Sequence, residues 1–280
     1  MKTQNLILLV FISILFSSCA TSTSYYQVYK TAHSDKIKLE ESNLVYEDDN
    51  CKVFYNLWRE GGEIGFKFYN KSDKNIYLNL EESFFVFNGY ANNYFKNRVY
   101  TNSSNSGSTV SYGVNASKSV TGFNYLDLIQ TNQISLLKSS GVISSKGYAV
   151  STNEEKIICI PSKTSKIISE YSINETLIRS CDLYKYPSKK QVKTISFQKN
   201  ESPFVFSNRI TYSVGQNTNQ VQFENEFYVM EIANYPEKEI MVLKTEEYCG
   251  QKSYVYKNYF KNATPDKFYI KYSTGQYLAH

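Results

Sequence analysis

From Leu44 onwards the chain contains short segments in which apolar and polar side chains alternate, separated by polar turns. The first four of these segments span residues 51–58, 63–70, 75–80 and 83–89. A period of two is typical of strands with one buried face, because successive side chains of a strand point to opposite sides of its sheet. The last segment ends in Asn88-Gly89, a pair that favours a tight turn between antiparallel strands. The pattern therefore predicts an all-β fold.

A weak internal repeat indicates how these strands are organised. "GFKFYNKSDKNIYLNL" (65–80) and "YVMEIANYPEKEIMVL" (228–243) each contain a strand that ends at Asn, at Asn70 and Asn234, followed by a polar turn with Lys and a second strand. Strand–turn–strand hairpins of this kind are common in immunoglobulin-like sandwiches. We expect one or two immunoglobulin-like β-sandwich units.

Residues 101–153 interrupt this pattern with a segment rich in Ser, Thr, Asn and Gly and nearly free of charge. Alternation returns at 154–173, so we interpret 101–153 as an insertion between two strands of one sheet. A segment this poor in bulky apolar side chains favours a mobile loop, and a protruding hairpin is the alternative. A lipid-inserting hairpin is a third possibility, against which Lys118 on the apolar face argues. The first unit then spans 43–175 and the second 176–280.

The beginning of the chain has the pattern of an export signal. Residues 6–16 form an apolar run interrupted only by Ser13, and Lys2 precedes it. This run matches the apolar region of a secretory signal peptide. As a helix it would extend only about 16 Å, whereas the hydrocarbon core of a membrane is about 30 Å thick. The run is therefore too short to span a membrane.

The stretch Phe16-Ser17-Ser18-Cys19 resembles the lipobox of bacterial lipoproteins, with Phe16 in place of the usual branched aliphatic residue. The resemblance implies that residues 1–18 are removed as a signal peptide and that Cys19 carries lipid. Two or more acyl chains anchor a protein stably, at about 0.8 kcal/mol per buried methylene. Residues 19–42 are then expected to form a lipid-anchored tether. Ordinary cleavage after Ala20 is the alternative.

Ala20 stands where an inner-membrane retention signal of a Gram-negative lipoprotein would place Asp, and no acidic cluster follows it. The resemblance therefore implies an outer-membrane location, with the periplasmic face favoured over the cell surface. In general style the chain is similar to Bacteroidetes envelope lipoproteins with immunoglobulin-like domains.

The composition is unusually rich in Tyr, with 26 among 280 residues, while the net charge is only +5 and is spread along the chain. No run of Lys and Arg marks a nucleic-acid surface, so we exclude nucleic acid as a partner. Aromatic side chains favour strands. Exposed aromatic side chains would also suit stacking on glycans, for which Trp58, Tyr90 and Tyr94 are the first candidates.

Four cysteines remain besides Cys19. An even number in an exported chain favours disulfides, and three connectivities are possible for four cysteines. Because a bridge within one unit needs no fixed geometry between units, we predict the pairs Cys51–Cys159 and Cys181–Cys249. There is no C-x-x-C pair and no nearby His, so a zinc or redox centre is not expected.

The sequence contains no recognisable catalytic motif. The two histidines, His33 and His280, lie outside any motif that would hold an imidazole against a nucleophile. Adjacent carboxylates occur, but neighbours on a strand point to opposite faces and do not form an acid–base pair. "EDDN" (47–50) has oxygen ligands without the spacing of a calcium loop. We therefore expect no enzyme, no metal and no cofactor.

Together these features predict a non-catalytic, lipid-anchored envelope protein with a binding or scaffolding role. Its expected partners are the membrane, through the lipid, and another envelope protein or a glycan. A carbohydrate-binding surface lipoprotein and a fimbrial-type anchored subunit are the alternatives.

Overall fold

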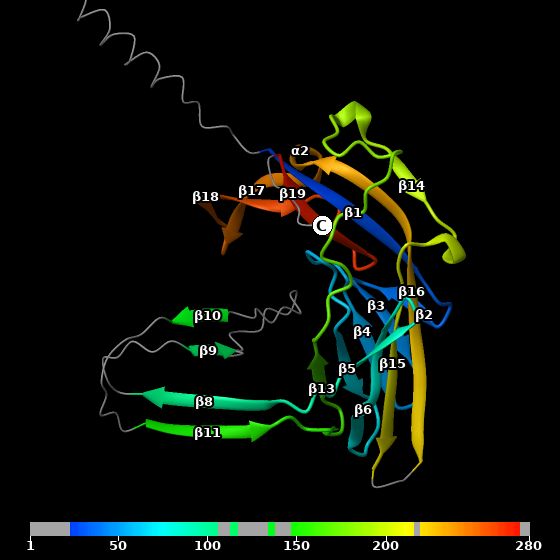
Figure 1. Cartoon of the computed structure of the whole chain (residues 1–280), viewed down its shortest axis with the longest axis vertical. Helices are drawn as coiled ribbons and strands as arrows, with labels where there is room; N and C mark the ends of the chain where they lie inside the picture. Colours follow the sequence, from blue (N-terminus) through cyan, green and yellow to red (C-terminus); the bar gives the residue numbers. More distant parts are fainter. Residues whose placement is uncertain (1–22, 106–112, 117–133, 138–146, 216–218, 275–280) are drawn as a thin grey trace, which may run out of the picture.

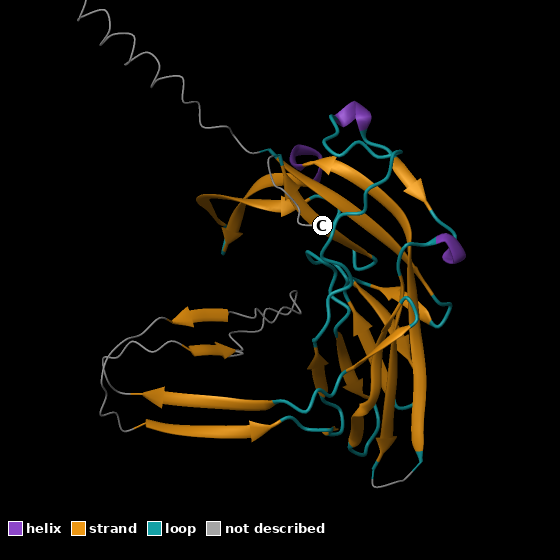
Figure 2. Ribbon diagram, in the orientation of Figure 1, coloured by secondary structure: helices purple, strands orange, loops and turns teal. Residues whose placement is uncertain are grey.

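The computed structural model describes residues 23–105, 113–116, 134–137, 147–215 and 219–274, and these form an almost entirely antiparallel β-structure (Figures 1 and 2). The larger sheet, sheet A, has the spatial order β12 (Ile157–Ile160), β6 (Ile76–Phe87), β15 (Val205–Val214), β16 (Gln220–Pro236), β1 (Ser24–His33) and β19 (Lys267–Ser273), with β7 (Tyr90–Asn93) on β6 and β14 (Thr194–Ser196) on β16. Sheet B has the order β13 (Ser165–Ile168), β5 (Phe66–Asn70), β4 (Cys51–Tyr55), β3 (Asn43–Glu47) and β2 (Ile37–Glu40).

Three two-stranded hairpins lie outside these sheets: β8 (Val99–Asn105) with β11 (Gly147–Asn153), β9 (Gly113–Ala116) with β10 (Ile134–Leu137), and β17 (Met241–Tyr248) with β18 (Gln251–Phe260). The helical elements of the described residues are short: α2 (Glu237–Ile240), η1 (Lys189–Gln191) and η2 (Lys199–Glu201). The predicted all-β, sandwich-like class is therefore confirmed.

The core lies between sheet B and strands β6, β15 and β16 of sheet A, and aromatic side chains fill much of it. Ring pairs join the two sheets: Tyr46 with Phe223, Phe68 with Tyr212, and Tyr55 with Phe227, with centroids 4.3, 5.6 and 5.3 Å apart. Such pairs contribute about 0.5–1.5 kcal/mol beyond the burial of their area. The core thus accounts for part of the abundance of Tyr and Phe, while several other Tyr side chains are exposed.

Buried amides also connect the sheets. Asn208 on β15 donates to the carbonyl of Ile64 at 2.8 Å and accepts from the Tyr94 hydroxyl at 2.6 Å. Its ladder partner Asn225 on β16 donates to the Tyr55 hydroxyl at 2.8 Å. Because a buried polar group without a partner costs free energy, these bonds also fix the register of the two sheets.

The structure corrects the predicted domain boundaries. Residues 24–33, assigned to the tether over 19–42, form β1 in the interior of sheet A, between β16 and β19. Strands from both predicted units, 43–175 and 176–280, belong to sheet A, where β6 of the first pairs with β15 of the second, so the described chain forms one sandwich. The strand was not recognised because two of its inward positions are polar. Gln27 and Thr31 are buried, and hydrogen bonds satisfy their side chains.

The internal repeat does not mark two equivalent hairpins. β5 and β6 belong to different sheets, and the chain crosses from sheet B to sheet A between them. Asn70 is buried at this crossing and donates to the carbonyls of Lys74 and Ile160 at 2.8 and 2.9 Å. Asn234 likewise donates to the carbonyl of Tyr184 at 2.9 Å. What the two segments share is therefore an asparagine that ties the end of a strand to a neighbouring loop.

The predicted insertion does leave from one sheet. β7 and β12 pair with successive parts of the same edge of β6, and the β8–β11 hairpin begins and ends between them. This hairpin extends away from both sheets (Figure 1), so the protruding-hairpin alternative describes residues 99–105 and 147–153. Residues 106–112, 117–133 and 138–146 lie outside the described chain. The predicted Asn88-Gly89 turn joins β6 to β7, with φ of 48° and 85°.

An ionic cluster fastens the base of this hairpin. Arg98 binds Glu154 through its side chain and Glu170 at 2.7 Å, and Lys96 binds Glu170 at 2.9 Å. The Glu154 side chain is only 7% exposed and also accepts the backbone N–H groups of Lys96 and Arg98. Burial opposes its ionisation, but these hydrogen bonds outweigh burial and hold the pKa of Glu154 below its usual value of 4.5.

We expect Glu154→Gln to lower the free energy of unfolding at pH 7 by about 1–3 kcal/mol, the cost of losing a hydrogen-bonded charge. Because the folded pKa is depressed, the contribution of Glu154 is present above pH 4.5 and is lost as the pH falls through the folded pKa. The difference in the free energy of unfolding between the variant and the wild type should therefore shrink below pH 4.5. Urea unfolding from pH 7 to pH 3 measures it.

The control is Glu81→Gln, which removes an exposed pair with Lys156. Exposed pairs contribute about 0–1 kcal/mol, so this variant should remain close to wild type throughout. Equal losses for the two variants would contradict the role given to Glu154.

Candidate binding surface

The structure contains neither predicted disulfide. All four described cysteines are free, and their positions explain why. Cys51 on β4 is fully buried in the core, whereas Cys159 is exposed on the edge strand β12 of the other sheet. Cys181 lies in an exposed loop, and Cys249 lies in the turn between β17 and β18, outside both sheets. The pairs Cys51–Cys159 and Cys181–Cys249 are therefore corrected to free thiols. Cys19 lies outside the described residues.

The three aromatic residues singled out for stacking on glycans lie in different environments. Tyr94 is buried in the core and Tyr90 is exposed at the start of β7. Trp58 is half-buried against the rings of Phe260 and Tyr269. They do not form one platform, and Trp58 lines a cavity. His33 is half-buried, with Nδ1 3.1 Å from the Ser34 carbonyl oxygen, and His280 lies outside the described residues.

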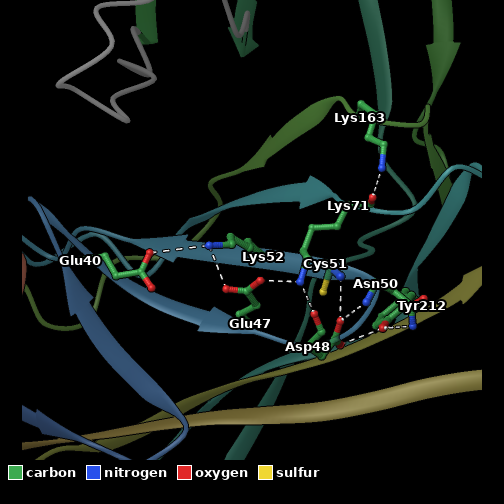
Figure 3. Close-up of polar contacts among 9 residues, drawn as sticks. All are labelled: Glu40, Glu47, Asp48, Asn50, Cys51, Lys52, Lys71, Lys163 and Tyr212. Carbon is green, nitrogen blue, oxygen red and sulfur yellow. Dashed lines mark hydrogen bonds and ion pairs between the residues drawn. The ribbon is translucent and has the colours of Figure 1, made fainter.

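The acidic stretch 47–50 stabilises a turn (Figure 3). Asp48 accepts the backbone N–H groups of Asn50 and Cys51 at 2.8 and 2.7 Å and the hydroxyl of Tyr212 on sheet A at 2.8 Å. Glu47 is paired with Lys52 at 2.8 Å and with Lys71. All these oxygens serve structural contacts. Within the described residues, no three His, Cys, Asp or Glu side chains gather as a metal site would require.

An aromatic cluster covers the outer face of sheet A where β1 begins. Its members are Tyr26, Trp58, Phe260 and Tyr269. The Phe260 ring lies 4.9 Å from Trp58, 4.7 Å from Tyr269 and 5.7 Å from Tyr26. Burial, reinforced by the nearby Glu237 carboxylate, raises the pKa of Tyr26 to about 12. The cluster thus holds the root of the β17–β18 hairpin against β1 and β19.

Beside this cluster is a cavity of about 230 Å³ over the outer faces of β1, β16 and β19. Trp58 forms an aromatic part of its wall, and the polar side chains that line it are Lys30, Thr194, Glu231, Glu239, Asn262 and Lys267. Lys30 and Glu231 face each other at 3.5 Å. One aromatic surface with several hydrogen-bonding groups suits a small polar molecule.

The β17–β18 hairpin itself presents an exposed apolar face. Thr245 pairs with Tyr256, and residues two apart on a strand point to the same face. Leu243, two residues before Thr245, and Tyr254, two residues before Tyr256, therefore lie on one face of the hairpin together with Tyr256. Their exposed fractions are 62, 99 and 68%, respectively. The other face carries Glu246, which pairs with Lys257 at 2.7 Å and accepts the Tyr259 hydroxyl at 3.1 Å. That face also carries Val255 and Tyr259, which are 62 and 36% exposed, so the hairpin exposes apolar side chains on both faces although it covers no core.

Sequence reasoning did not single out this hairpin. The signal was present in "YVYKNYF" (254–260), where four of seven residues are aromatic and the first two of them alternate with Val255. The same alternation occurs in buried strands such as β5, so only the three-dimensional structure distinguishes a strand that packs on a core from one that protrudes.

Comparison with protein-family models, with curated proteins and with solved structures found no match to this chain. None of the helices in the described residues has the length and apolar character needed to cross a membrane.

We expect thiol labelling to distinguish Cys51 from the other cysteines. Burial, with Asp48 nearby, raises the pKa of the Cys51 thiol, so in the native protein it should react far more slowly than Cys159, Cys181 and Cys249. Peptide mapping after alkylation, without reduction, measures each site. Labelling of Cys51 and Cys159 only after reduction would instead demonstrate the bridge that the structure lacks.

Proposed function

We propose that this protein is a lipid-anchored component of the cell envelope with a non-catalytic binding role. It is attached through Cys19 to the outer membrane and faces the periplasm. The observation that carries the proposal is the lipobox-like Phe16-Ser17-Ser18-Cys19, followed five residues later by the start of a core strand at Ser24. In such a chain the short connection between the lipid and the first core strand keeps the sandwich close to the membrane.

The binding surface of this proposal is the end of sheet A that carries the cavity and the β17–β18 hairpin. Exposed apolar faces and concave sites with convergent polar groups are the features by which proteins recognise partners. Both features adjoin β1, and therefore the attachment point.

A carbohydrate-binding role is the second candidate, favoured by the composition of the cavity wall. Sugars present apolar ring faces and many hydroxyl groups, and the cavity offers Trp58 together with carboxylate, amide and ammonium groups. A ligand of the size of a monosaccharide matches its volume of about 230 Å³.

The anchor is tested with Cys19→Ala. The variant should move from the membrane fraction to the soluble fraction, because the acyl chains are the proposed attachment. Mass spectrometry of the mature wild-type N-terminus should find a diacylglyceryl-modified Cys19. An unmodified N-terminus at Thr21 would disprove the anchor and support cleavage after Ala20.

The carbohydrate candidate is tested by fluorescence, since Trp58 is the single Trp of the chain. Titration with neutral and N-acetylated sugars should change its emission with saturation, at a Kd of the order of 1 mM, or about −4 kcal/mol. Asn262→Ala should weaken the response, and Tyr90→Ala, an exposed aromatic residue outside the cavity, should leave it unchanged. A flat titration with every sugar would exclude this candidate.

A further inference from the structure

The hairpin face that carries Leu243, Tyr254 and Tyr256 begins next to the start of β1. Phe260 pairs with Met241 in the first rung of the hairpin and contacts Tyr26, two residues after the start of β1. The Tyr26 hydroxyl also bonds to Glu237 in α2, the turn that leads into β17. The start of β1 and the root of the hairpin are therefore held together.

We propose that the apolar face formed by Leu243, Tyr254 and Tyr256 lies in the interfacial layer of the membrane, as a second contact beside the lipid anchor. This inference rests on the proposed attachment through Cys19. It adds a specific protein surface to the acyl chains and restricts how the sandwich is oriented on the bilayer.

The lengths of the two connections are compatible with this arrangement. Five residues from Cys19 to Ser24 reach at most about 18 Å. Six residues from Phe260 to Tyr254 extend about 20 Å along β18. The acyl chains and the outermost exposed Tyr can therefore meet the same membrane plane without any change in the sandwich.

The chemistry of the hairpin favours a lipid surface over a protein groove. Tyr is preferred at membrane interfaces because its ring enters the apolar layer while its hydroxyl stays hydrated. Lys252 follows the same face next to Tyr254 and lies opposite Glu247. Between residues 241 and 261 there are four Lys and two Glu, an excess of positive charge that suits anionic headgroups.

Depth-dependent quenching tests this proposal on the full-length, lipidated protein. In a Trp58→Phe background, Tyr256→Trp provides a single reporter on the apolar face. Its emission should shift to the blue and be quenched by lipids brominated near the headgroup. The matched control is Val221→Trp, an exposed apolar position at the other end of β16, which should show neither change.

A second measurement separates the hairpin from the anchor. The mature chain with Cys19→Ser should bind vesicles containing anionic lipid weakly. Replacing Leu243, Tyr254 and Tyr256 together with Ser should lower that partitioning about tenfold or more, corresponding to at least about 1.4 kcal/mol. These side chains are exposed, so the melting temperature should remain within a few degrees.

The outcomes distinguish the two proposals. Mass spectrometry of the same sample reports the acyl chains, so an unmodified Cys19 rejects the anchor whatever the reporter shows. An acylated protein whose Tyr256→Trp emission is neither shifted nor quenched rejects the membrane contact. Crosslinking of this hairpin face to a second copy or to another envelope protein, with no quenching by lipid, would assign the face to a protein partner and equally overturn the inference.

Discussion

The ladder that joins β1 to β16 on one side and to β19 on the other is the constraint on which the rest of the arrangement depends. Tyr26 pairs with Tyr235 and with Lys271, more than two hundred residues later in the chain. On the inner face of β1, Gln27 donates to the Asn234 side chain and accepts the backbone N–H of Ile178, which links the strand to β16 and to a loop. This ladder brings the beginning and the end of the described chain together.

Buried amides in a sandwich are costly unless they are hydrogen-bonded, and this requirement explains how several loops are placed on the sheets. The same solution recurs at Asn70, Asn208 and Asn234, each of which bonds to a loop backbone or to a facing side chain. These bonds specify how loops lie on the sheets, whereas the aromatic pairs supply most of the apolar burial. Replacing the buried amides would remove the bonds that position loops and sheets, whereas replacing the aromatic residues would remove much of the buried apolar area.

Sequence patterns predicted the fold where local signals were sufficient. The alternation at 51–55 and the turn at Asn88-Gly89 follow from the chemistry of adjacent residues, and both are present. β1 was missed because its inward side chains include Gln27 and Thr31, whose burial depends on partners far along the chain. The crossing from β5 to β6 and the separation of the cysteines were likewise beyond local reasoning, since long-range topology determines which strands become neighbours.

The position of β1 also changes what an anchor at Cys19 would do. A flexible tether over residues 19–42 would span about 25–30 Å on average and leave the sandwich free to turn. With a core strand starting at Ser24, the connection shortens to about 18 Å at most and enters the sheet near Tyr26 and Phe260. An anchored molecule would then hold its cavity near the membrane surface, so a ligand of that cavity would have to be available there rather than in the open periplasm.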